Sequence, residues 1–201
     1  ELLQNAEDAD ATDAIFILER DKFVFEHNGR PFTEIDVKNI TNIGKGKQDE
    51  DRIGRFGIGF KSVFAYSETP QIYSPTYSFK ITDMVLPSEI PKNHSRGRNT
   101  RFEFPFNSIK KDPTQAYQEI EAGLRGLAGT TLLFLASLRC LRWTILGQDD
   151  WELRRREHSD HIVEITMEKS SMIKSHRAFL RFSQPVIGLN KQSVSIAFEC
   201  F

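Results

Sequence analysis

The chain has 201 residues, of which 39% are hydrophobic and 27% charged, as in an ordinary globular protein of one domain, or of one domain and part of another. Its net charge of −1 gives no reason to expect binding to nucleic acid or to a membrane, and no apolar run reaches the roughly 20 residues that span a bilayer. Only two cysteines occur and no leader-like segment comes first, which predicts a reducing, cytoplasmic location.

The first nine residues, Glu-Leu-Leu-Gln-Asn-Ala-Glu-Asp-Ala, are predicted to form a helix with a polar face. In a helix, Glu1, Asn5 and Asp8 fall within an arc of roughly 60°. Their oxygen atoms could hold Mg²⁺ and its waters, with one carboxylate left to act as a base. A solvated surface face explains the same pattern, so this stretch alone leaves both interpretations open.

Residues 13–19 and 22–26 are predicted to form a strand hairpin around a short polar turn. Gly29 and Pro31 then interrupt regular structure. Thr33, with Asp36 three residues later, is typical of a capping box at the start of a helix that should end near Gly44.

Residues 44–59 hold five glycines and many charges, which favours a flexible loop directly before a helix that begins at Phe60. Within it, Gly54-Arg55-Phe56-Gly57-Ile58-Gly59 could converge backbone N–H groups on an anion, and the helix start would add more. The loop lacks the strand and the parallel βαβ unit of a dinucleotide-binding fold, and the G-K-[ST] of a Walker A loop.

Further along, strands are predicted at 71–74, 77–82 and 99–106, with a surface loop over 87–98. A helix should run from Asp112 to about Leu127, followed by a buried segment at 132–141 and a strand at 142–145. Beyond residue 147, the runs 161–165, 178–182 and 193–198 alternate like antiparallel strands. The run Arg154-Arg155-Arg156 is flanked by acids, which favours a solvated turn or helix face.

The order of four motifs resembles the GHKL (Bergerat-fold) ATPases, and within them the sacsin-like, heat-shock-chaperone-like N-terminal ATP-binding domain family. The matching stretches are ELLQNAEDADAT, HNGRPFTEIDV, IGRFGIGFKSVF and a later Leu-Leu-Phe-Leu. The resemblance covers residues 1–145. It implies an α+β fold, a Bergerat two-layer α/β sandwich with a mostly antiparallel mixed sheet and helices on one face. Residues 146–201 carry no motif and are expected to be a β-rich extension or the start of a following domain in a longer chain.

By the same resemblance, Glu1 matches the general base that activates water, Asn5 the Mg²⁺ ligand and Asp8 a pocket acid. Residues 44–53 match the lid. A Thr supporting the base edge is expected at Thr100 or at Thr130, and Thr100 is preferred because this motif should precede the long helix. The remaining implied nucleotide contacts are Ala9, His27, Asn28, Gly29, Phe32, Gly44, Lys45, Lys47, Gly54, Arg55, Phe56, Gly57, Ile58, Gly59, Phe60 and Lys61.

One position departs from the superfamily pattern. His27 stands where most members have the Asp that accepts a hydrogen bond from the adenine amino group. A neutral His could accept one hydrogen bond, and Asn28 could replace the carboxylate if the register slips by one residue. Specificity for adenine, or the affinity for ATP, is therefore expected to differ from that of typical members.

The resemblance thus implies a domain that binds ATP and Mg²⁺ and hydrolyses ATP slowly. Lid closure would drive a conformational change in a larger sacsin-like chaperone or bacterial defence protein. Expected partners are the other domains of its own chain, and a homodimer could form through ATP-dependent closure. Two alternatives stay open: a degenerate nucleotide-sensing or structural interaction domain without turnover, and a DNA-processing GHKL ATPase, which the net charge does not support.

Overall fold

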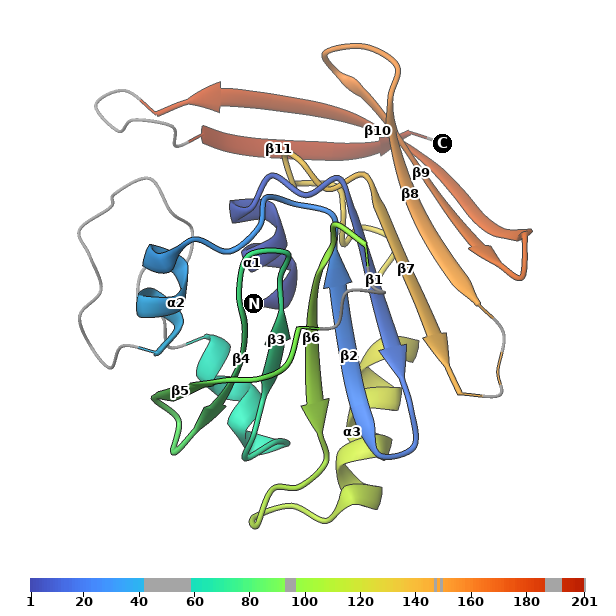
Figure 1. Ribbon diagram of the computed structural model, residues 1–201. Helices are drawn as coiled ribbons and strands as arrows, with labels where there is room; N and C mark the ends of the chain where they lie inside the picture. The colour runs from blue at the N-terminus through green and yellow to red at the C-terminus, as the bar shows by residue number, and fades with distance from the viewer. Residues whose placement is uncertain (42–58, 93–96, 147, 149, 187–192, 201) are drawn as a thin grey trace.

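The computed structural model describes residues 1–41, 59–92, 97–146, 148, 150–186 and 193–200. Within them, eleven strands form one sheet in the order β11-β10-β9-β8-β7-β1-β2-β6-β3-β4-β5 (Figure 1). Neighbouring strands pair antiparallel except β1 and β7, which are parallel. The strands are β1 (Asp13–Leu18), β2 (Lys22–His27), β3 (Gln71–Tyr73), β4 (Ser78–Thr82), β5 (Leu86–Glu89), β6 (Thr100–Pro105), β7 (Cys140–Ile145), β8 (Trp151–Glu157), β9 (Ile162–Lys169), β10 (Met172–Pro185) and β11 (Ser193–Cys200).

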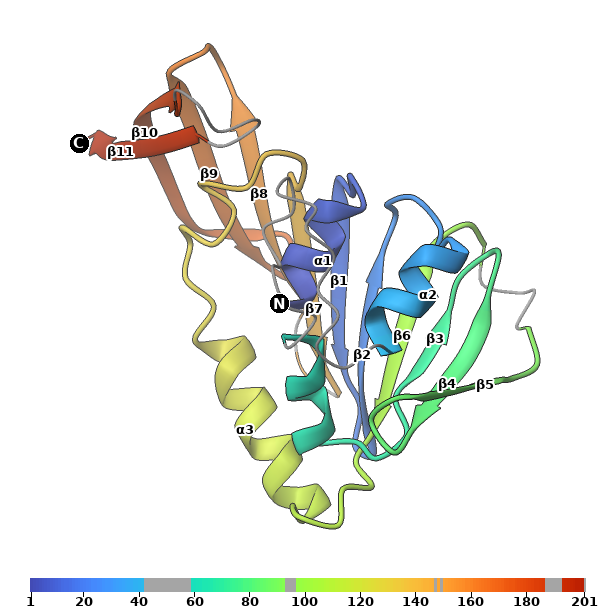
Figure 2. The same ribbon diagram turned by 90° about the vertical axis from the view of Figure 1, so that its left-hand side faces the viewer.

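The helices of the described residues are short, and they are α1 (Leu2–Asp8), α2 (Glu34–Thr41), the 3-10 helix η1 (Phe60–Ala65) and α3 (Pro113–Arg125). Figure 2 shows α1 and α3 on the same side of β1 and β2. The capping box is confirmed, because Asp36 Oδ2 accepts from the N–H of Thr33 at 2.8 Å and Thr33 Oγ1 accepts from the N–H of Asp36 at 3.3 Å. The start of α3 is also confirmed, with the Asp112 carboxylate accepting from the N–H of Thr114 at 2.8 Å.

Aromatic side chains build the core under the helices. The register of the central strands places Phe16 opposite Phe25, and Phe25 opposite Phe102. Their ring centroids are 4.9 Å and 5.8 Å apart, and Phe60 of η1 packs on Phe102 at 6.1 Å. Because Phe25 is fully buried, its ring alone contributes about 2–3 kcal/mol of burial free energy.

The predicted two-layer α/β sandwich is wrong. The structure is a single mixed sheet of eleven strands with few helices, and the part described after residue 145 contains strands and no helix. Figure 1 shows β10 and β11 lying across the top of the sheet, strongly rotated relative to β1. The physical reason is that β7 offers an unpaired edge to β8, so the C-terminal residues extend the same sheet by hydrogen bonding instead of forming a second layer.

The sheet runs without interruption past residue 145, because β7 pairs with β8 across the short connection between them. The division of the chain into residues 1–145 and 146–201 stays a prediction. No helix among the described residues is long and apolar enough to cross a membrane.

Three local predictions differ from the structure. Residues 60–65 form a 3-10 helix of one or two turns, which is too short to offer the dipole of a full α-helix. Part of the predicted surface loop at 87–98 belongs to β5. The arginine run lies in β8, where residues alternate between the two faces of the sheet, so Arg155 is buried while Arg154 and Arg156 are exposed.

Candidate functional site

Helix α1 has a glycine packed against each of its ends. At its start, a Cβ on Gly59 would lie 1.8 Å from Oε2 of Glu1, so the carboxylate rests directly on the glycine backbone. At its end, a Cβ on Gly29 would lie 2.5 Å from the carbonyl oxygen of Ala9. The N–H of Arg30 donates to that same oxygen at 2.8 Å. The two glycine-containing motifs are distant in sequence, and each contacts one end of the same helix, which is about 10 Å long.

The polar face of α1 forms as predicted. Glu1 occupies the N-cap position, where its side chain makes no capping hydrogen bond and its carbonyl accepts from the N–H of Asn5 at 2.8 Å. Asn5 is half-buried one turn later, and its carboxamide makes no hydrogen bond to the part of the chain that the structure describes. Asp8 is half-buried, and its charge helps raise the pKa of Arg30 behind the larger effect of Asp36. These oxygen groups suit Mg²⁺, a hard cation that binds few protein ligands and keeps its waters.

His27 is buried at the end of β2, opposite Thr100 of β6. Burial, followed by the positive charge of Arg30, lowers the pKa of His27 from 6.5 to about 4. The ring is therefore neutral near pH 7, and its Nδ1 accepts from the N–H of Gly29 at 3.1 Å. Because that lone pair is used, the proton lies on Nε2, which can only donate a hydrogen bond.

Asn28 also uses both ends of its side chain within the protein. Its Oδ1 accepts from the N–H groups of Thr12 at 2.9 Å and Asp13 at 3.0 Å. Its Nδ2 donates to Thr12 Oγ1 at 2.8 Å and to Asp13 Oδ2 at 3.2 Å. The side chain thus fixes the connection between α1 and β1, and its oxygen has no lone pair left for the amino group of a base.

Thr100 is fully buried beside His27, and its hydroxyl lies 3.3 Å from Ser74 Oγ. The N–H of Phe32 donates to the same Ser74 oxygen at 2.9 Å. Thr130 instead lies in a turn after α3, where its carbonyl accepts from the N–H of Leu133 at 2.9 Å. Of the two threonines considered, Thr100 is therefore the one that lies next to the end of β2.

Of the glycine loop at 44–59, the described structure contains only the last residue, Gly59, which is followed by η1. Phe60 is buried in the aromatic core, so its backbone but not its ring is available to a ligand. Lys61 is half-buried and forms no ion pair with the described residues. The expected lid at 44–53 and these expected contacts lie outside the described residues: Gly44, Lys45, Lys47, Gly54, Arg55, Phe56, Gly57 and Ile58.

Glu7 is a residue of this helix that the sequence interpretation missed. It is buried, and its carboxylate accepts from the N–H groups of Ala136 at 2.5 Å, Ser137 at 2.6 Å and Leu138 at 3.0 Å. Helical periodicity gives the only signal, since position 7 falls beside buried Ala6 and away from the Glu1–Asn5 face. A carboxylate on the apolar side of a helix requires donors from elsewhere in the fold.

Comparison with known proteins finds a sacsin domain over residues 1–125. The chain is 28% identical to Protein NO VEIN of Arabidopsis thaliana over 202 residues, covering 86% of this chain and 7% of that protein. It is 36% identical to Sacsin of Homo sapiens over 93 residues, covering 37% of this chain and 2% of that protein. The chain thus spans less than a tenth of the length of either of these curated relatives.

Proposed function

Because the chain belongs to the sacsin domain family, we propose that it is a GHKL-type module that binds Mg·ATP and hydrolyses it slowly within a larger sacsin-like chaperone or defence protein. One observation carries the proposal. The Glu1 carboxylate lies against the backbone of Gly59, so the acid at the start of α1 and the end of the glycine loop converge on one place. This is the arrangement that hydrolysis of a terminal phosphate needs, where positioning and charge neutralisation do most of the work.

The roles follow from the positions along α1. Glu1, exposed at the helix start, would orient water and take its proton. The carboxamide oxygen of Asn5, one turn on, would hold Mg²⁺, which neutralises phosphate charge. At the other end of the helix, His27 and Thr100 lie together where a base would bind. The lid that the family resemblance implies lies outside the described residues, and in the proposed function it would exclude water and pass a conformational change to the rest of the parent chain.

The proposal is tested by calorimetric titration with ATP, ADP and GTP, with and without Mg²⁺, and by a turnover assay. Glu1→Gln should retain nucleotide binding and lower turnover by about 100-fold or more, the usual effect of removing a general base. Asn5→Ala should lose the Mg²⁺-dependent part of binding. Gln118→Ala, at an exposed position of α3 outside the candidate site, is the matched control and should change neither. Wild-type turnover by Glu1→Gln would show that the base is assigned wrongly.

A second candidate function, a nucleotide-sensing or structural interaction domain without turnover, is favoured by one observation. Nδ1 of His27 and Oδ1 of Asn28 already accept hydrogen bonds from the protein, so neither is free to accept one from the adenine amino group. The same titrations distinguish the two, because the absence of heat with every nucleotide would leave only the structural function. We also propose a cytoplasmic location, consistent with two cysteines that are both unpaired.

A further inference from the structure

Helix α1 cannot hold its own position. It has seven residues, its N-cap side chain makes no capping hydrogen bond, and no basic residue occupies its last turn. Helices this short are unstable in isolation, so the orientation of the Glu1–Asn5 face must come from tertiary contacts. Two residues of α1 are buried, and only one of them, Glu7, has a polar side chain that reaches another element.

That element is residues 132–138, here called the clamped segment. It is irregular in conformation yet carries the buried Leu132, Leu133 and Leu138, so its backbone groups need partners inside the protein. Glu7 supplies the acceptor for three of its N–H groups. On the carbonyl side, arginine side chains are the partners from other elements, and the Leu132 carbonyl also accepts from the N–H of Leu135 at 3.3 Å.

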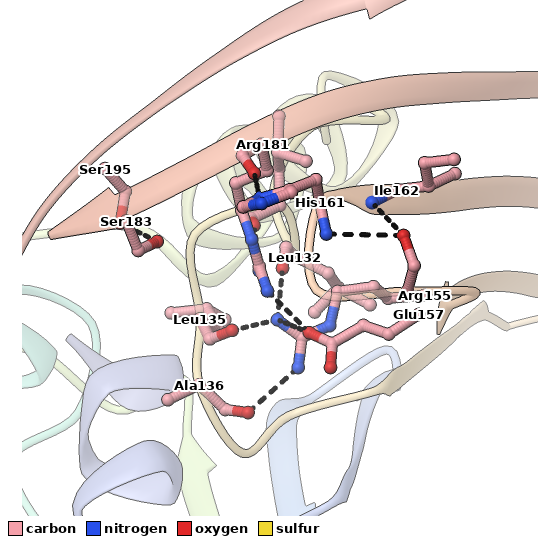
Figure 3. Close-up of polar contacts among 12 residues, drawn as sticks. Leu132, Leu135, Ala136, Arg155, Glu157, His161, Ile162, Arg181, Ser183 and Ser195 are labelled. Carbon is pink, nitrogen blue, oxygen red and sulfur yellow. Dashed lines mark hydrogen bonds and ion pairs between the residues drawn. The ribbon is translucent and has the colours of Figure 1, made fainter.

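Arg155 of β8 supplies most of the donors to the clamped segment. Its Nη1 donates to the carbonyl of Leu135 and, at 3.4 Å, to that of Leu132, and its Nη2 donates to Ala136 at 2.9 Å (Figure 3). Its guanidinium is buried, and its Nε has no hydrogen-bond partner in the described structure. Arg181 of β10 adds a bond from Nη1 to the Leu133 carbonyl at 3.0 Å.

Ala136 is hydrogen-bonded through both of its backbone groups, its N–H to Glu7 of α1 and its carbonyl to Arg155 of β8. A buried anion and a buried cation thus share one backbone segment. The peptide dipoles between Glu7 and Arg155 help to satisfy both charges, and Glu157 Oε1 also lies 3.8 Å from Nη1 of Arg155. Removing Glu7 or Arg155 leaves the other with fewer favourable partners. The two side chains are expected to act as one unit and not as two independent contacts.

We propose that Glu7 and Arg155 are positioning residues that lock the Glu1–Asn5 face of α1 to β8 and β10 through the clamped segment. The expected effect on nucleotide binding rests on the proposed function, whereas the link between α1 and the C-terminal strands does not. The C-terminal strands then determine the position of the Glu1–Asn5 face of α1. By reciprocity, a ligand that binds to that face changes the stability of those strands.

The link is tested first without nucleotide, by amide hydrogen exchange on Arg155→Met. Exchange at residues 136–138 should rise about tenfold or more, since the segment loses hydrogen bonds to a charged group, and residues 5–9 of α1 should exchange faster with it. Arg156→Met is the matched control, because Arg156 is the next residue of the same strand but exposed. Loosening of the segment without any change in α1, no loosening at all, or an equal effect of Arg156→Met, would each overturn the proposal.

Arg155→Lys keeps the charge and some donors, so it should restore part of the protection. If Arg155→Met does not fold, Arg155→Lys takes its place in the exchange experiment, and Arg156→Lys becomes the matched control. The double variant Glu7→Gln with Arg155→Met should raise the unfolding constant by much less than the product of the two single effects, because both act on one segment. Independent, multiplying effects would contradict the shared role.

The nucleotide consequence is tested by calorimetry at a temperature where every variant is folded. Arg155→Met should weaken the binding of Mg·ATP by about 2- to 30-fold, the range of couplings between separated sites, while Arg156→Met should not. Unchanged affinity in Arg155→Met would overturn the positioning role. If the wild type binds no Mg·ATP, the proposed function fails, and the exchange experiment still decides whether the link exists.

Discussion

Replacing His27 by Asn should remove a strong pH dependence from the stability of this protein. His27 is 3% exposed, and its Nδ1 accepts from the backbone of Gly29. Asn places an oxygen close to the position of Nδ1 and does not titrate, so the variant keeps the acceptor and loses the proton equilibrium. Its smaller side chain lowers stability at every pH, which makes the pH dependence, and not the absolute stability, the informative quantity.

The magnitude follows from burial. The pKa of His27 is lowered from 6.5 to about 4, so between these values the unfolded chain binds a proton that the folded protein does not. Stability must therefore fall as pH falls from about 7 to about 4, and His27 contributes no further loss below that. Each pH unit contributes roughly 1.4 kcal/mol, so the full loss is about 3 kcal/mol, or a few hundredfold in the unfolding constant.

The assay is urea unfolding followed by tryptophan fluorescence at several pH values between 7.5 and 4. The free-energy difference between wild type and His27→Asn should shrink by about 3 kcal/mol across that range, because titrating groups common to both chains cancel. Replacing the buried Ile72 by Val is the matched control, because it also lowers stability but removes no titrating group, so it should leave the pH dependence of the wild type. A difference that stays constant within about 0.5 kcal/mol would refute the assignment of His27 as a neutral buried residue.

Three glycine substitutions separate function from stability. The new Cβ of Gly59→Ala should displace the flexible end of the Glu1 side chain, so turnover should fall by about tenfold or more. The free energy of unfolding in urea should change by less than about 1 kcal/mol. Normal turnover in this variant would contradict the contact between Glu1 and Gly59. Gly29→Ala should destabilise by about 1–3 kcal/mol in the same unfolding assay, because its Cβ would meet backbone atoms of Ala9, and a neutral result would be inconsistent with that packing. A Cβ on Gly123 in α3 would meet no described atom within 4 Å, so Gly123→Ala should stabilise the protein by up to about 1 kcal/mol. A lower melting temperature in this control would contradict that expectation.

Local elements were accessible from the sequence wherever neighbours along the chain carry the signal. The capping box at Thr33 and the start of α3 at Asp112 are made by side chains that bond backbone two or three residues away. The hairpin of β1 and β2 follows from alternation on either side of a short turn. In contrast, the sequence does not reveal the strand that contains Arg155, because three consecutive arginines mask the alternation and one of its two buried positions is charged.

The sheet order shows where such reasoning ends. The parallel pairing of β1 with β7 joins residues more than 120 positions apart, and the sequence of neither strand indicates which strand it pairs with. Once β7 is placed, its open edge pairs with β8, and the sheet grows to eleven strands instead of the expected layered domain. Edge pairing depends on unpaired backbone groups, which every strand has, so composition cannot predict it.

For the candidate site, the sequence by itself determined the face of α1 on which Glu1 and Asn5 lie, because helical spacing is a property of the chain alone. Only the tertiary structure decided that Gly59 contacts Glu1 and that Nδ1 of His27 already accepts a hydrogen bond. It also decided that Glu7 binds the backbone of a segment about 130 residues away. Those contacts depend on burial and on which backbone groups are left without partners after folding. Both quantities exist only once distant parts of the chain have come together.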